Sequence, residues 1–133
     1  MTQDDNGKLQ AVAQMACISD MMRRYREAQE IGGRESYTAM EAVEEEIMAD
    51  PLEISVRSLW TPLGYPMEAD EFRILLCTGG PAVQIVGDLD EYGCIFGQPN
   101  IEYQDWFTPW RPLTITEDQQ KDLLEYCQMF NFC

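Results

Sequence analysis

The chain opens with two segments in which hydrophobic residues recur at steps of three and four, the spacing of one face of an α-helix. They predict helices over about residues 8–30 and 35–49. The pair Gly32-Gly33 ends the first helix, and Asp50-Pro51 ends the second. The predicted apolar stripes consist of Val12, Met15, Ile18, Met22 and Tyr25 in the first helix and Tyr37, Met40, Val43 and Ile47 in the second.

From residue 52 the period changes to two, which is typical of β-strands. Leu52, Ile54 and Val56 alternate with polar residues and predict a first, half-buried strand in a run that ends at Trp60. Two further strands, 71–77 and 82–86, flank the turn 78–81 and form a predicted hairpin in the middle of a sheet. A turn-rich loop over 88–100 then precedes a fourth strand at 101–107, and residues 108–112 are extended.

Thr116 and Gln119 fit a capping box, which marks the start of a last helix. This helix is predicted to run to about Phe130. The predicted order is therefore ααββββα. It indicates an α+β fold, with an antiparallel sheet of about four strands packed by helices. We expect residues 1–133 to form a single domain, of which residues 1–7 are flexible.

Charge adds a clue about partners. Twenty-four acidic residues face nine basic ones, which gives a formal net charge of −15. The excess lies in two blocks, residues 35–71 with ten acids and residues 88–125 with nine. A field of this sign repels nucleic acid and attracts basic protein surfaces, so we expect a protein partner and no direct nucleic-acid binding.

The candidate chemistry is sparse. The sequence has no histidine, which is the commonest general base, and none of the usual hydrolase, protease or nucleotide-binding motifs. Five cysteines without C-x-x-C spacing suggest reduced thiols. We therefore expect no catalytic site, no cofactor and no metal; an enzyme that uses Cys94 or a carboxylate pair is a remaining alternative. The N-terminus has no signal pattern, and no apolar run is long enough for a membrane helix, so we expect a cytoplasmic protein.

The acidic residues are the main candidates for partner contact. Carboxylates at spacings similar to those of phosphates can occupy a groove built for DNA, which makes the second helix the first choice. Loops beside a rigid sheet supply further patches, and Trp110, if exposed on its proline-flanked segment, is a candidate anchor. The candidate residues are Glu41, Glu44, Glu45, Glu46, Glu68, Asp70, Glu71, Asp88, Asp90, Glu91 and Trp110.

Arg23, Arg24 and Arg26, with Arg34 nearby, form the main concentration of positive charge. Pairing with acids of the same chain is one interpretation. The other is a homodimer in which this cluster meets the acidic block of a second copy.

Three stretches resemble small uncharacterised proteins carried by phages, plasmids and conjugative elements. They are Pro51–Ser58, Ile74–Val83 with Gly87–Asp90, and Glu102–Trp106, and the resemblance covers about residues 36–133. In size, charge and lack of catalytic motifs the chain resembles the anti-CRISPR and antirestriction inhibitors that such elements carry. The resemblance implies a non-enzymatic inhibitor that mimics DNA and binds a host defence nuclease, with a CRISPR effector nuclease as the expected target. The alternative is a small homo-oligomeric adaptor or accessory protein whose acidity serves solubility only.

Overall fold

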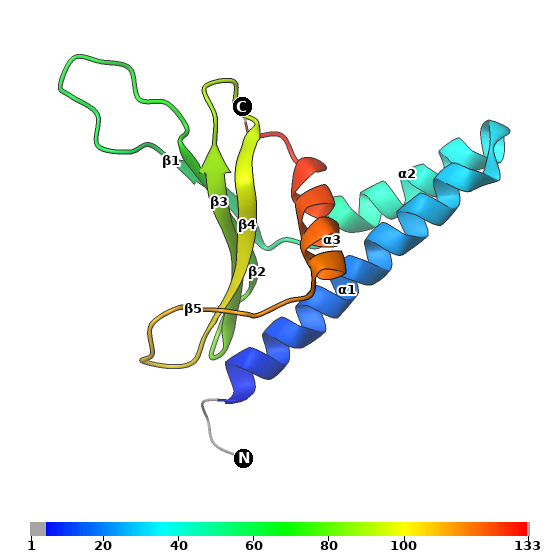
Figure 1. Cartoon of the computed structure of the whole chain (residues 1–133), viewed down its shortest axis with the longest axis horizontal. Coiled ribbons are helices and arrows are strands. Elements are labelled where there is room, and N and C mark those ends of the chain that lie inside the picture. Colours follow the sequence, from blue (N-terminus) through cyan, green and yellow to red (C-terminus); the bar gives the residue numbers. More distant parts are fainter. Residues whose placement is uncertain (1–4, 133) are drawn as a thin grey trace.

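Three helices and a five-stranded antiparallel sheet make up residues 5–132, the part of the chain that the computed structural model describes (Figure 1). The elements are α1 (Asp5–Ile31), α2 (Gly33–Ala49), β1 (Glu53–Arg57), β2 (Glu71–Cys77), β3 (Ala82–Leu89), β4 (Ile95–Gln104), β5 (Arg111–Pro112) and α3 (Glu117–Gln128). Each strand pairs with the next one in sequence. The α+β fold and the order of elements are confirmed, with β5 as an additional short strand.

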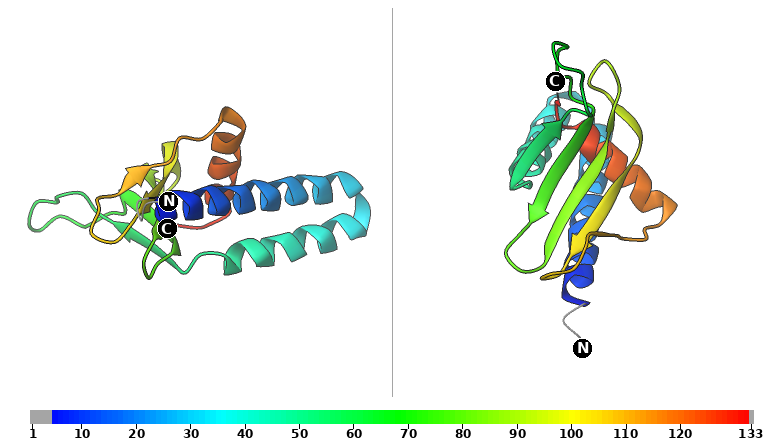
Figure 2. Two further views of the ribbon diagram at one scale, coloured as in Figure 1. Left: turned by 90° about the horizontal axis from the view of Figure 1, so that it is seen from below. Right: turned by 90° about the vertical axis from the view of Figure 1, so that its left-hand side faces the viewer.

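The helices cover one face of the sheet, and the other face is open to solvent (Figure 2). Helix α1 packs against α2, α3, β3 and β4. The core between the layers contains a row of isoleucines at matching register positions, Ile74, Ile85 and Ile101. Phe132 packs on Phe72 with ring centroids 4.5 Å apart, so the C-terminal segment covers β2.

The helical hairpin, residues 5–49, turns at Gly32, whose φ of 79° is easily reached only by a residue without a side chain. The buried stripe of α1 contains Ala11, Met15, Ile18 and Met22. The predicted core positions Val12 and Tyr37 are instead exposed. The tip of the hairpin extends beyond the sheet, so within residues 5–132 the first turns of α2 pack mainly against α1 (Figure 1).

The start of α1 also departs from the prediction. The helix begins at Asp5, and the buried Gly7 donates its N–H to Oδ1 of Asp105 at 2.8 Å. Residues 5–7 are therefore held in the fold, whereas residues 1–4 of the predicted flexible segment lie outside the described residues. No helix within residues 5–132 is long and apolar enough to cross a membrane.

Strand β1 was expected to be half buried, and this is wrong. Leu52, Ile54 and Val56 are 61%, 40% and 47% exposed. Alternation predicts that one face of a strand is apolar, but it does not say whether a helix lies above that face. Here β1 is the edge of the sheet, and the helices pack over the strands further in.

The predicted loop over residues 88–100 is largely strand. Strand β3 continues to Leu89 and β4 starts at Ile95, so a short turn joins them. The Asp90 carboxylate makes this turn by accepting the N–H groups of Tyr92 and Cys94 at 2.8 and 3.0 Å. Strand β4 ends at Gln104, earlier than expected, because Asp105 and Thr108 close a turn around Phe107, which has a φ of 64°.

The capping box of α3 is confirmed. Thr116 Oγ1 accepts the Gln119 N–H at 3.1 Å, and Gln119 Oε1 accepts the Thr116 N–H at 3.0 Å. The Tyr126 hydroxyl donates to Oδ2 of Asp50 at 2.6 Å, which ties α3 to the residue that follows α2. This contact fixes where the chain leaves the helical hairpin and enters β1.

Candidate protein-binding site

The acidic residues of α2 divide between two faces of the helix. Glu41, Glu44 and Glu45 line a shallow, open hollow together with Met48 and Ala49. Glu46 lies apart from them, where its two oxygens accept bonds from Arg24 at 2.7 and 2.8 Å. These bonds hold the pKa of Glu46 below its ordinary value. The first three glutamates thus form one acidic face, and the charge of Glu46 is compensated.

The arginines of α1 are all paired within the chain. Arg23 bonds Asp20 and Glu27 at 2.6 and 2.9 Å, and Arg24 bonds Asp20 as well as Glu46. Arg26 reaches across to α3, where it bonds Asp122 at 2.6 Å and also contacts Glu125. These three arginines of the cluster are therefore paired internally, as the first of the two interpretations predicts, whereas the exposed Arg34 makes no ion pair within residues 5–132.

The structure joins two acidic patches that are separate in the sequence. Glu71 of β2 lies opposite Asp88 of β3, and the Leu89 N–H donates to the Asp70 carbonyl at 2.8 Å. The β1–β2 loop and the β3–β4 turn both lie at the upper end of the sheet in Figure 1. We call this region, residues 58–70 and 88–96 together with Glu71, the loop end. It contains the candidates Glu68, Asp70, Glu71, Asp88, Asp90 and Glu91.

Three of these six acids serve the fold. Asp70 accepts the Leu59 N–H at 2.8 Å, and Asp90 shapes the β3–β4 turn. Glu71 pairs with Arg57 at 2.9 Å. The other three, Glu68, Asp88 and Glu91, are exposed and make no ion pair within residues 5–132. These three carboxylates are the ones available to a partner.

The loop end also exposes large apolar side chains that sequence reasoning missed. Trp60 and Leu63 are fully exposed, and Leu59, Tyr65 and Met67 are 60% to 80% exposed. They belong to the long β1–β2 loop in Figure 1. Tyr92 and Phe96 are exposed on the neighbouring β3–β4 hairpin. Large apolar side chains exposed in one region of a protein are typical of interaction sites.

Backbone and side-chain hydrogen bonds order the β1–β2 loop at both its base and its tip. At the base, the Asp70 N–H donates to the Arg57 carbonyl at 3.0 Å, beside the Asp70–Leu59 bond. At the tip, the Tyr65 N–H donates to the Pro62 carbonyl at 3.1 Å. The only sequence signal for this surface is a set of apolar residues without helical or strand period among prolines and glycine.

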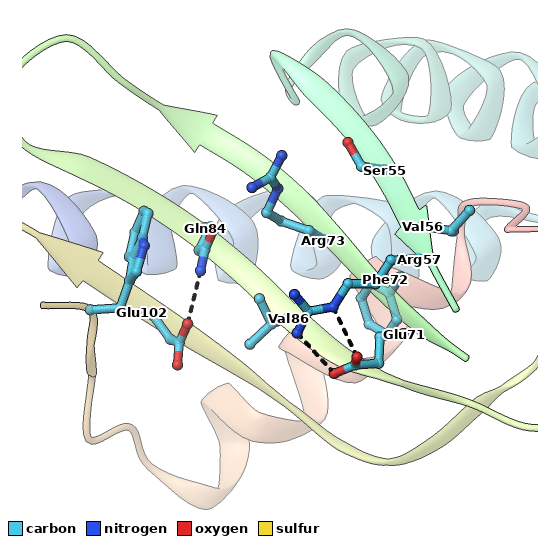
Figure 3. A pocket seen from close by; sticks show the side chains of 10 residues that line it. Ser55, Val56, Arg57, Glu71, Phe72, Arg73, Gln84, Val86 and Glu102 are labelled. Carbon is cyan, nitrogen blue, oxygen red and sulfur yellow. Dashed lines mark hydrogen bonds and ion pairs between the residues drawn. The ribbon is translucent and has the colours of Figure 1, made fainter. Parts of the chain in front are cut away.

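Trp110 is half-buried and is not an exposed anchor. It lines a hollow of about 570 Å³ on the helix-free face of the sheet, shown from close by in Figure 3. Within this hollow Arg57 pairs with Glu71, and Gln84 donates to Glu102 at 2.9 Å. The remaining cation of the hollow, Arg73, makes no ion pair within residues 5–132.

The prediction of a strand over residues 101–107 does not hold for Trp106 and Phe107. They are 66% and 99% exposed, with ring centroids 5.7 Å apart. They lie in the turn that follows β4, at the end of the sheet away from the loop end (Figure 1). Their position makes them a natural control for the apolar residues of the loop end.

Comparison of the chain with protein-family models, curated proteins and solved structures found no match. Within the described residues, no group of three or more cysteine or acidic side chains could hold a metal ion.

Proposed function

We propose that this protein is a non-enzymatic inhibitor that binds the nucleic-acid surface of a host defence nuclease, with a CRISPR effector nuclease as the proposed target. One observation carries the proposal. The loop end presents exposed aromatic and aliphatic side chains beside the free carboxylates of Glu68, Asp88 and Glu91.

The two kinds of side chain have different tasks in this proposal. Nucleic-acid-binding grooves are lined with arginine and lysine, so the carboxylates speed encounter and compete with phosphates. Once docked, Trp60 and Tyr65 anchor the complex, because tryptophan and tyrosine are enriched among residues that dominate binding energy. The acidic face of α2, Glu41, Glu44 and Glu45, adds long-range attraction.

The test is a binding and cleavage assay with purified CRISPR effectors, with and without guide RNA, across a salt series. We expect binding that weakens with salt and prevents DNA loading. Trp60→Ala should weaken binding about 100-fold, as loss of an anchor does. The matched control is Phe107→Ala, which removes an equally exposed aromatic residue at the other end of the sheet and should change affinity less than about twofold.

Absence of binding to every effector would overturn the proposed target. Equal losses from Trp60→Ala and Phe107→Ala would overturn the proposed site. The second candidate function, a small homo-oligomeric accessory protein, is favoured by the uncovered edge strand β1 and predicts binding that salt does not weaken.

A further inference from the structure

The outer edge of β1 has no neighbouring strand within residues 5–132. Natural proteins protect such edges with short strands, charged residues (lysine above all), proline, bulges or a covering element, because an open edge pairs with other strands. β1, with the sequence Glu-Ile-Ser-Val-Arg, has neither lysine nor proline, and its pairing with β2 is regular. We propose that two copies of this chain pair antiparallel through β1, about a twofold axis at Ser55.

The β1 sequence is complementary to itself in this register. Antiparallel pairing about Ser55 puts Glu53 of each copy opposite Arg57 of the other, on the same face of the joined sheet. Ile54 of each copy lies opposite Val56 of the other, on the face that the helices cover further in. The Glu53–Arg57 ion pair and the Ile54–Val56 apolar pair are each formed twice, as a twofold interface requires.

The pairing also accounts for the exposure of the apolar residues around β1. Ile54 and Val56 gain apolar neighbours across the new strand pair. At the ends of the strand, Leu52 of one copy lies opposite Ser58 of the other, on the same face as Ile54 and Val56. Leu52 is 61% exposed in the single chain. One register thus places three uncovered apolar positions of each copy, Leu52, Ile54 and Val56, on one face.

Arg57 supports this register because it is already ordered at the edge. Its guanidinium pairs with Glu71 of β2 at 2.9 Å and stays 78% exposed. In the dimer it lies between Glu71 of its own chain and Glu53 of the second copy. This interface does not use the arginines of α1, so it is distinct from the dimer expected from sequence.

The test exchanges charges and needs no partner protein. Sedimentation equilibrium of the whole chain over a concentration series should give a dimer. Glu53→Arg puts two like-charged pairs into the interface, and so does Arg57→Glu, so each variant alone should weaken dimerisation about tenfold or more. Mixing the two variants restores opposite charges at every pair, and the mixture should form a heterodimer.

A control separates this effect from net charge. Glu91→Arg makes the same change in charge as Glu53→Arg at an exposed site outside β1, and lowers the repulsion between two acidic chains. It should leave dimerisation intact or strengthen it. The proposal is overturned if the natural chain remains monomeric at about 100 μM, where edge pairing of micromolar affinity would be saturated. It is also overturned if the two charge variants dimerise normally or fail to form a heterodimer when mixed.

Discussion

The helical hairpin and the loop end are both acidic, but they use their acids differently. In the hairpin, Asp20, Glu27 and Glu46 bond arginines of the same chain. At the loop end, Glu71 pairs with Arg57 of β1, and large apolar side chains stand beside carboxylates that make no ion pair within residues 5–132. Net charge therefore does not locate a binding surface. A binding surface is better located by two criteria together. Its acidic residues make no ion pair within the chain, and exposed apolar side chains lie beside them.

The largest expected effect on stability lies on the hairpin side. Arg26→Ala removes the ion pairs that join α1 to α3 and leaves Asp122, whose side chain is 12% exposed, without its cation. We expect a loss of about 1–2 kcal/mol in the free energy of unfolding, measured by urea denaturation. Arg34→Ala is the control, because Arg34 is exposed and makes no ion pair within residues 5–132.

The control should change the free energy of unfolding by less than about 0.5 kcal/mol. Binding of the nuclease should be unchanged by both variants. A drop in affinity from Arg26→Ala, measured where the variant is fully folded, would contradict the account that the hairpin arginines stabilise the fold and the loop end binds the partner.

The second expected effect concerns association rate. Neutralising the free acids of the loop end by Glu68→Gln, Asp88→Asn and Glu91→Gln should slow association with the nuclease about tenfold at low salt. Neutralising Glu41, Glu44 and Glu45 to glutamine removes the same number of charges from α2. It should slow association only about twofold to threefold, because these charges lie away from the apolar anchors. Stopped-flow kinetics at two salt concentrations compares them, and equal slowing would show that position does not matter.

Features that depend on residues close together in the sequence could be predicted, and features that depend on packing between elements could not. The element order and the α3 cap followed from local periodicity and from Thr116 with Gln119, which act within a few residues. The roles of Glu45 and Glu46 did not follow, because only the packing of α2 on α1 decides which of them meets Arg24.

The proposed binding surface was harder to predict for a physical reason. Exposed apolar residues of an irregular loop have no period, so Trp60 and Tyr65 carry no local signature of their exposure. The turn-forming residues within 88–100 predict a long loop, but the same residue types also make the short turn of a hairpin, as Asp90 does here. Trp110 was chosen for its type, and its half-burial depends on the sheet beneath it.

A smaller effect separates two adjacent glutamates. Glu46→Gln loses the bonds to Arg24, whereas Glu45→Gln makes the same change in charge and loses no ion pair within residues 5–132. Because the Arg24–Glu46 pair is exposed, we expect Glu46→Gln to be less stable than Glu45→Gln by only about 0.5 kcal/mol. Paired thermal melts can measure this difference. No difference would mean that the ion pair is without effect on stability.

The smallest effect is the pH dependence of the same cluster. Bonds from Arg23 and Arg24 lower the pKa of Asp20, and bonds from Arg24 lower that of Glu46. Their contribution is thus present above the ordinary carboxyl pKa values and is lost as the pH falls through the lowered ones. The stability difference between the natural chain and Arg24→Gln should therefore shrink as the pH falls below the ordinary carboxyl pKa values of 4.5 for Glu46 and 3.8 for Asp20. A constant difference would contradict this linkage.

The most direct test of the central claim compares two tyrosines. Tyr65 of the loop end and Tyr37 of α2 are 70% and 71% exposed, so truncating either one removes the same group from the same degree of solvent contact. The affinity of Tyr65→Ala and Tyr37→Ala for the proposed target, a CRISPR effector nuclease, should be measured side by side at physiological salt. The account predicts a loss of about tenfold or more for Tyr65→Ala and nearly none for Tyr37→Ala. An equal loss for both, or a larger loss for Tyr37→Ala, would contradict it.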